Sequence, residues 1–298
     1  HRLPLARRPM ESDHRGVRVT FKRLDVVKFV LSAVIFYGVL VGALYLIQRS
    51  MMYFPWSDVP VPAESGVPEM RPIRLTTADG FTLTSWYRPA PSGQPTVVFF
   101  HGNAGHVGHR GFKARVFLDA GFGLVLVGYR GYGGNPGRPN EAGLYADGRA
   151  VLAFLAGSGV PPARIALFGE SLGSGVAVHL AFEAARDGTP VGAVVLEAPF
   201  SSVAAAAQHH YPYLPAYWLV KDRFASIDKI ADIRAPLLVI HGARDQVIPE
   251  RFGREVFAAA REPKESLWLP HADHNDVFKH GVAATLTAFI RRRLGDAP

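Results

Sequence analysis

Residues 164–185 read RIALFGESLGSGVAVHLAFEAA. The stretch begins with an apolar run typical of a buried strand and ends with a run typical of a helix. Between the two, residues 169–173 (GESLG) fit the pattern G-x-S-x-G. In that pattern the serine lies on a strained strand-to-helix turn, and glycines replace side chains that would clash there. We therefore predict that Ser171 is a nucleophile at the end of a strand.

The sequence on both sides of this stretch alternates between short apolar runs and helix-like segments. Continuous apolar strands indicate a sheet covered on both faces, hence a mostly parallel sheet flanked by helices and an α/β fold class. Two strands at 71–77 and 81–88 form a hairpin across the turn at 78–80. Further strands are predicted at 96–100, 124–127, 165–168, 191–196, 237–240 and, more weakly, 266–269, and helices at 110–120, 141–156, 172–186, 250–260 and 276–292.

A serine hydroxyl is a weak nucleophile and needs a general base that is oriented by an acid. With a nucleophile of this kind, the acid and then the histidine follow the serine along the chain. His274 lies in LPHADHND, after the last predicted strand, and His271 is its rival. Asp245 lies in HGARDQVIP, directly after the strand LLVI, and Glu197 is the alternative acid. We predict the set Ser171, Asp245 and His274.

Attack on a carbonyl places negative charge on oxygen, which backbone N–H groups can stabilise. One predicted donor is the N–H of Leu172, the residue after the nucleophile. The other is the N–H of Asn103, in the HGNAG turn that follows the strand at 96–100. The alternative is that HGNAG is only a tight turn between a strand and a helix.

Residues 200–226 interrupt the alternation with an aromatic-rich segment that contains two prolines. An insertion here would lie over the carboxyl ends of the strands, where open α/β sheets bind ligands. We predict a small lid. Its aromatic residues either line a substrate pocket or form the core of the lid itself. The candidate substrate-binding residues are Phe200, Tyr211, Tyr217 and Trp218.

Residues 29–47 form an uncharged run, FVLSAVIFYGVLVGALYLI, about 30 Å long as a helix and thus as long as a bilayer core is thick. We predict a transmembrane anchor. The run is too long for a usual signal peptide and no small-x-small cleavage site follows it; a core helix is a further alternative. The predicted organisation is a basic arm at 1–28, the anchor, a surface linker at 48–70 and a catalytic domain at 71–298.

Charge is concentrated ahead of the anchor. Eight Lys or Arg and three Asp or Glu lie in residues 1–28, which is most of the net charge of +8. The positive-inside rule then predicts a cytoplasmic N-terminus and a periplasmic or otherwise extracytoplasmic catalytic domain. The bulk of the chain has no basic surface motif, so we predict no nucleic-acid partner. It has no cysteine and no HExxH, so we predict no thiol nucleophile and no metal site.

The chain resembles the α/β-hydrolase superfamily and, more narrowly, its membrane-anchored ABHD-type proteins. The matching stretches are QRSMMYFP, TADGFTLTSWY, HGNAG, YRGYGGNPGRPNEAGLYAD, GESLGSG, HGARDQVIP and HADHND, in that order across residues 48–292. The resemblance implies a serine hydrolase without metal or organic cofactor that acts on acyl esters or thioesters, lipid-like ones included, through an acyl-enzyme. It assigns nucleophile, acid and base to Ser171, Asp245 and His274. An acyl-protein thioesterase or a peptidase is the alternative, and the complete triad disfavours a non-catalytic binding protein.

Overall fold

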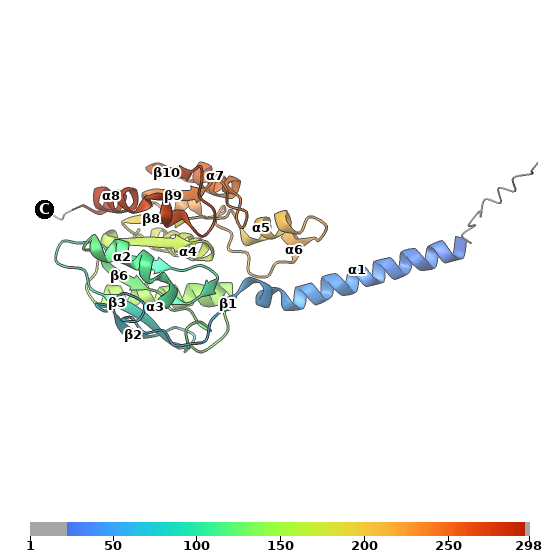
Figure 1. The fold of residues 1–298 in the computed structure, drawn as a ribbon, viewed down its shortest axis with the longest axis horizontal. Helices are drawn as coiled ribbons and strands as arrows, with labels where there is room; N and C mark the ends of the chain where they lie inside the picture. Colours follow the sequence, from blue (N-terminus) through green and yellow to red (C-terminus); the bar gives the residue numbers. More distant parts are fainter. Residues whose placement is uncertain (1–22, 296–298) are drawn as a thin grey trace, which may run out of the picture. The chain divides into compact units, whose positions relative to one another are not determined.

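The computed structural model describes residues 23–295, and the chain divides into two units, His1–Leu44 and Tyr45–Pro298 (Figure 1). Most of the basic arm therefore lies outside the described residues. Helix α1 (Arg23–Met52) includes the predicted anchor and has no buried residue. In the described part of the chain, it is the one helix long and apolar enough to cross a membrane. It continues through residues 48–52, which the sequence assigned to the linker.

The second unit is built on an eight-stranded sheet, as predicted for this fold class (Figure 1). All neighbouring strands pair in parallel except those on either side of β3, which runs antiparallel to both of its neighbours. In spatial order the strands are β10 (Lys264–Leu269), β9 (Leu237–Gly242), β8 (Ala193–Glu197), β7 (Ile165–Glu170), β4 (Thr96–Phe100), β6 (Gly123–Leu126), β3 (Thr82–Arg88) and β2 (Arg71–Thr76).

The central strands are buried on both faces, and because successive side chains point to opposite sides, one strand contributes to two hydrophobic clusters. In β4, Val98 and Phe100 join one hydrophobic cluster, and Val97 and Phe99 join the other. Residues of α3, α4 and α7 fill the first cluster, and residues of α2 and α8 fill the second. These helices are α2 (Gly111–Asp119), α3 (Glu141–Gly157), α4 (Leu172–Arg186), α7 (Glu250–Ala259) and α8 (Val282–Leu294).

Two segments differ from the sequence-based prediction. The final helix is divided, because Gly281 adopts φ +75° between a 3-10 turn, η4 (Val277–His280), and α8. The predicted surface linker is packed into the second unit, with Tyr53, Val67 and Met70 buried. Within it, β1 (Phe54–Pro55) pairs in parallel with β5 (Ala104–Gly105). The remaining 3-10 turns are η1 (Val107–Arg110), η2 (Pro162–Arg164) and η3 (Ile230–Asp232).

The segment predicted as a lid lies between β8 and β9 and contains two short helices, α5 (Val203–His210) and α6 (Ala216–Leu219). The side chain of Ser202 caps α5 by accepting a hydrogen bond from the N–H of Ala205. Pro215 precedes α6. Like the turn at Ser171 between β7 and α4, which we call the elbow, this segment begins at the carboxyl end of a central strand. Open α/β sheets place their ligands at that edge.

Candidate active site

Ser171 lies on the turn between β7 and α4 with φ +50° and ψ −114°, a backbone conformation that L residues rarely adopt. The flanking glycines are needed because the backbone is crowded. A Cβ on Gly173 would lie 2.0 Å from the carbonyl oxygen of Phe100, and one on Gly169 would lie 2.6 Å from that of Gly173. The N–H of Ser171 donates to the carbonyl of Glu197 at 2.8 Å. The glycines of the G-x-S-x-G pattern are thus required because the turn has no space for a Cβ at either position.

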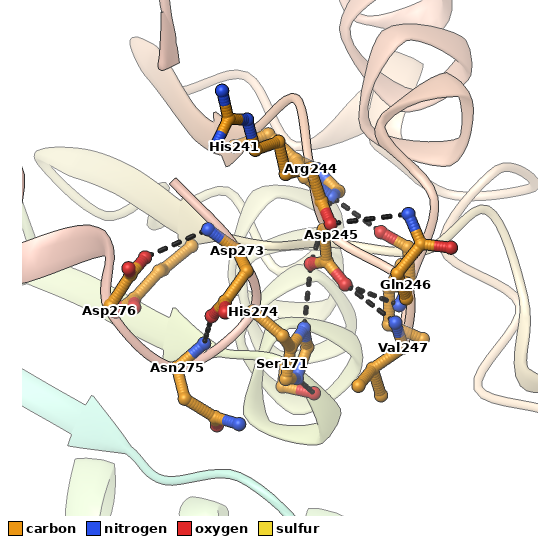
Figure 2. A network of polar contacts seen from close by, with 12 residues as sticks. Ser171, His241, Arg244, Asp245, Gln246, Val247, Asp273, His274, Asn275 and Asp276 are labelled. Atoms are coloured by element: carbon orange, nitrogen blue, oxygen red, sulfur yellow. Dashed lines mark hydrogen bonds and ion pairs between the residues drawn. The ribbon is translucent and has the colours of Figure 1, made fainter. Parts of the chain in front are cut away.

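The structure brings Ser171, His274 and Asp245 together at the carboxyl ends of three strands (Figure 2). His274 Nε2 lies 3.0 Å from Ser171 Oγ, and His274 Nδ1 lies 2.7 Å from Asp245 Oδ2. With Nδ1–H donating to the carboxylate, Nε2 is left as the acceptor for the serine proton. This is the arrangement of nucleophile, base and orienting acid that acyl transfer requires.

Asp245 is buried and holds more hydrogen bonds than the one to His274 (Figure 2). Its Oδ1 accepts from the N–H groups of Val247 and Ile248, at 2.9 and 2.7 Å, and His241 Nε2 lies 3.4 Å from Oδ2. Burial raises the pKa of this carboxyl, but the bonds from His241, His274 and the backbone outweigh it and lower the pKa to about 2. Asp245 is therefore ionised at neutral pH.

The two alternative residues have other partners. His271 Nδ1 lies 3.2 Å from Arg244 Nη2, and the side chain of His271 is exposed. Glu197 accepts two hydrogen bonds from Lys113 Nζ, both at 2.9 Å. The acidic residues of the His274 loop hold that loop in place (Figure 2). The Asp276 carboxylate accepts a hydrogen bond from the N–H of Asp273, and the Asp273 carboxylate accepts one from the N–H of Asn275.

The HGNAG turn lies directly beside the nucleophile, because a Cβ on Gly102 would be 3.6 Å from Ser171 Cβ. Among the described residues, the N–H groups of Asn103 and Leu172 donate no hydrogen bond within the protein. His101 Nδ1 lies 2.7 Å from the carbonyl oxygen of Gly102, in the same peptide unit as the Asn103 N–H. Burial lowers the pKa of His101 to about 3, so its ring is neutral. The Asn103 N–H of this turn and the Leu172 N–H after the nucleophile are therefore both left without an acceptor among the described residues.

Sequence reasoning missed a buried charge cluster behind the elbow. Lys113 Nζ bonds both Glu197 and Glu170, and Arg110 bonds Glu170 at 2.8 Å. Burial raises the pKa of Glu170, but Lys113 and Arg110 outweigh it and hold that pKa well below its usual range. The cluster connects α2 to β7 and β8. The only hint in the sequence is two basic residues on a helix that has to pack against the sheet.

The structure does not gather the four aromatic residues predicted to bind substrate into one group. Phe200 is 2% exposed and packs in the main core, where a Cβ on Gly175 would lie 3.2 Å from its ring. Tyr211, Tyr217 and Trp218 are on the lid and exposed, Trp218 by 79%. Tyr217 contacts Trp218 edge to face, and Arg223 lies over its ring. Phe200 is part of the core because the first residues of the predicted lid segment pack against α4.

Comparisons with known proteins agree with the fold. A family profile described as serine aminopeptidase, S33, matches residues 91–225. An uncharacterized protein of Mycobacterium tuberculosis is 46% identical over 77% of this chain and 81% of its own length. Protein bem46 of Schizosaccharomyces pombe is 31% identical over 79% of this chain and 82% of its own. Human protein ABHD12B is 36% identical over 59% of this chain and 53% of its own.

Solved structures show the same fold at low identity. A Pyrococcus furiosus esterase superimposes with a TM-score of 0.65 at 21% identity, and the match covers 82% of this chain and 99% of the esterase. In residues 23–295, no group of three or more His, Cys, Asp or Glu side chains is placed to hold a metal ion.

Proposed function

This chain belongs to the α/β-hydrolase superfamily, among its ABHD-type members, and we propose that it is a membrane-anchored serine hydrolase that cleaves carboxylic esters or thioesters. One observation carries the proposal. A hydrogen-bonded chain runs from Asp245 through His274 to Ser171, and the N–H groups of Asn103 and Leu172 have no acceptor within residues 23–295. This geometry supports acyl transfer through a covalent intermediate.

In the proposed reaction, Ser171 Oγ attacks the substrate carbonyl while His274 Nε2 accepts its proton. Asp245 holds the imidazole in the required tautomer and stabilises the imidazolium that forms. The oxyanion accepts hydrogen bonds from the N–H groups of Asn103 and Leu172. His274 then protonates the leaving alcohol or thiol. Water, deprotonated by His274, attacks the acyl-enzyme and releases the acid and Ser171.

Helix α1 supports the membrane location, and an enzyme held at a bilayer meets lipid-like acyl substrates first. The family profile suggests a second candidate, an aminopeptidase. Such an enzyme needs a carboxylate for the free amino group of its substrate. Glu170, the residue before the nucleophile, and Glu197 are instead paired with Lys113 and Arg110. Neither carboxylate is therefore free to bind an amino group, which favours an uncharged acyl group as the substrate.

A fluorophosphonate probe tests the nucleophile in the full-length protein. We expect stoichiometric labelling of the wild type and none of Ser171→Ala. Ser174→Ala is the matched control, because Ser174 is a buried serine of α4 whose Oγ has no hydrogen-bond partner among the described residues. Full labelling of Ser171→Ala would overturn the assignment. Turnover of p-nitrophenyl esters, acyl thioesters, lysophospholipids and aminoacyl anilides then separates the candidate substrates.

A further inference from the structure

The end of α1 is bonded directly to the turn that carries Asn103. The side-chain Nδ2 of Asn103 donates to the carbonyl of Met52 at 2.8 Å, and the N–H of Phe54 donates to the carbonyl of Asn103 at 2.9 Å. Tyr132 donates its hydroxyl to that same carbonyl, also at 2.8 Å. Asn103 is thus held at its side chain and at its carbonyl, which restricts how its own N–H can turn.

The same short segment is also bonded to the carboxyl end of the lid. Arg49 donates two hydrogen bonds to the buried carboxylate of Asp222, at 2.8 and 2.9 Å, and the hydroxyl of Tyr53 donates a third at 3.1 Å. Gln48 donates to the carbonyl of Leu219 and accepts from the N–H of Lys221 at 2.7 Å. Residues 48–54 therefore contact both the lid and the oxyanion turn.

We propose that residues 48–54, the juxtamembrane segment, position the active site: they hold the Asn103 N–H toward the substrate oxygen and fix the end of the lid. This inference rests on the proposed hydrolase function. An oxyanion donor acts only at hydrogen-bond distance from the oxygen, and displacements near 1 Å can cost about 100-fold in rate. Met52, Arg49 and Asp222 touch no substrate in this proposal, so they are positioning residues.

Because Asp222 is buried, its carboxylate needs Arg49 as a partner. Asp222 is 4% exposed, and a buried carboxylate without its partner is costly. Among the described residues, loss of Arg49 leaves Tyr53 as the remaining side-chain donor to this carboxylate. We expect the segment and the end of the lid to shift so that water can reach the carboxylate. The shift reaches Asn103 through Met52 and Phe54, which lie within a few residues along the chain.

The test uses full-length protein in detergent, with kcat and KM measured on the best p-nitrophenyl ester. Rates are counted per site labelled by fluorophosphonate at completion, so unfolded molecules do not contribute. We expect Asn103→Ala to lower kcat about tenfold or more with KM within about twofold, because the oxyanion forms only in the transition state. We expect Arg49→Ala to lower kcat about threefold to tenfold, and Arg49→Lys to restore part of the loss.

Arg149→Ala is the matched control. Arg149, on α3, also donates two hydrogen bonds to one carboxylate, that of Glu183 on α4. Its kcat should stay within twofold of the wild type, and no variant should move the pH profile, since none touches His274 or Asp245. Wild-type kcat per labelled site in Arg49→Ala and Asn103→Ala overturns the inference. If Asn103→Ala gives no labelled sites, Arg49→Ala and Arg49→Lys decide alone. Absence of labelling in the wild type would instead refute the proposed function.

Discussion

At the scale of single residues, the acid is held more firmly than its role toward His274 alone requires. Four groups face the Asp245 carboxylate, namely His274, His241 and the N–H groups of Val247 and Ile248. Two of these bonds come from the loop that directly follows β9. The carboxylate is therefore oriented by its own loop as well as by the imidazole, which defines where His274 has to lie.

This arrangement predicts a specific loss of stability in acid. The folded-state pKa of Asp245 is about 2, below its ordinary value of 3.8, so the native state favours the ionised form. Ionised Asp245 contributes about 2 kcal/mol to the free energy of unfolding. This contribution is fully present above pH 4 and is lost as the pH falls toward 2. Urea unfolding of the second unit between pH 5 and 2 measures it.

Asp245→Asn provides the comparison for this loss. The variant has no carboxyl at this position, so its free energy of unfolding should fall less steeply between pH 4 and 2 than that of the wild type. Other carboxyls titrate in both proteins and cancel in the difference. Parallel curves for the two proteins would show that Asp245 is not held ionised by the fold.

At the scale of elements, the elbow depends on how closely α4 approaches β4. Gly173 lies against the carbonyl of Phe100, where a Cβ would come within 2.0 Å of backbone oxygen. Backbone cannot yield as a flexible side chain can. The glycine after the nucleophile therefore serves the packing of a helix against a neighbouring strand as well as the turn itself.

Gly173→Ala should destabilise the second unit by about 1–3 kcal/mol and slow fluorophosphonate labelling of Ser171 by about 100-fold. Gly157→Ala is the control, because Gly157 ends α3 with nothing within 4 Å of an added Cβ. That change should leave labelling unaltered and stability equal or slightly higher. Thermal unfolding and labelling rates check both. Equal behaviour of the two variants would contradict the packing argument.

At the scale of the whole molecule, charge and hydropathy along the chain predict topology. Eight Lys or Arg occur in residues 1–28, whereas Arg49 is the single basic residue between the apolar run and Arg71. The positive-inside rule predicts that the arm lies in the cytoplasm and the catalytic unit on the other side of the membrane. A carboxyl-terminal reporter active only outside the cytoplasm should be active, and a cytoplasm-specific reporter should not. The reverse pattern would refute this orientation.

Much of this architecture was predictable because it is encoded locally. The continuous apolar runs of the strands, the helices between them and the glycines around Ser171 depend on neighbours a few residues away. Strand β4 was predicted at its observed bounds, Thr96–Phe100. The order of serine, acid and histidine named three residues that the structure places in hydrogen-bond contact.

The sequence by itself determined the sheet, the elbow and a short list of residues for each role. Only the tertiary structure decided that His274 rather than His271 meets Ser171, that Phe200 belongs to the core, and that Lys113 pairs with Glu197. It alone showed the end of α1 bonded to Asn103. The reason is physical, since these contacts join residues that are far apart in sequence. Their distances depend on how strands stack and helices pack, which no local pattern records.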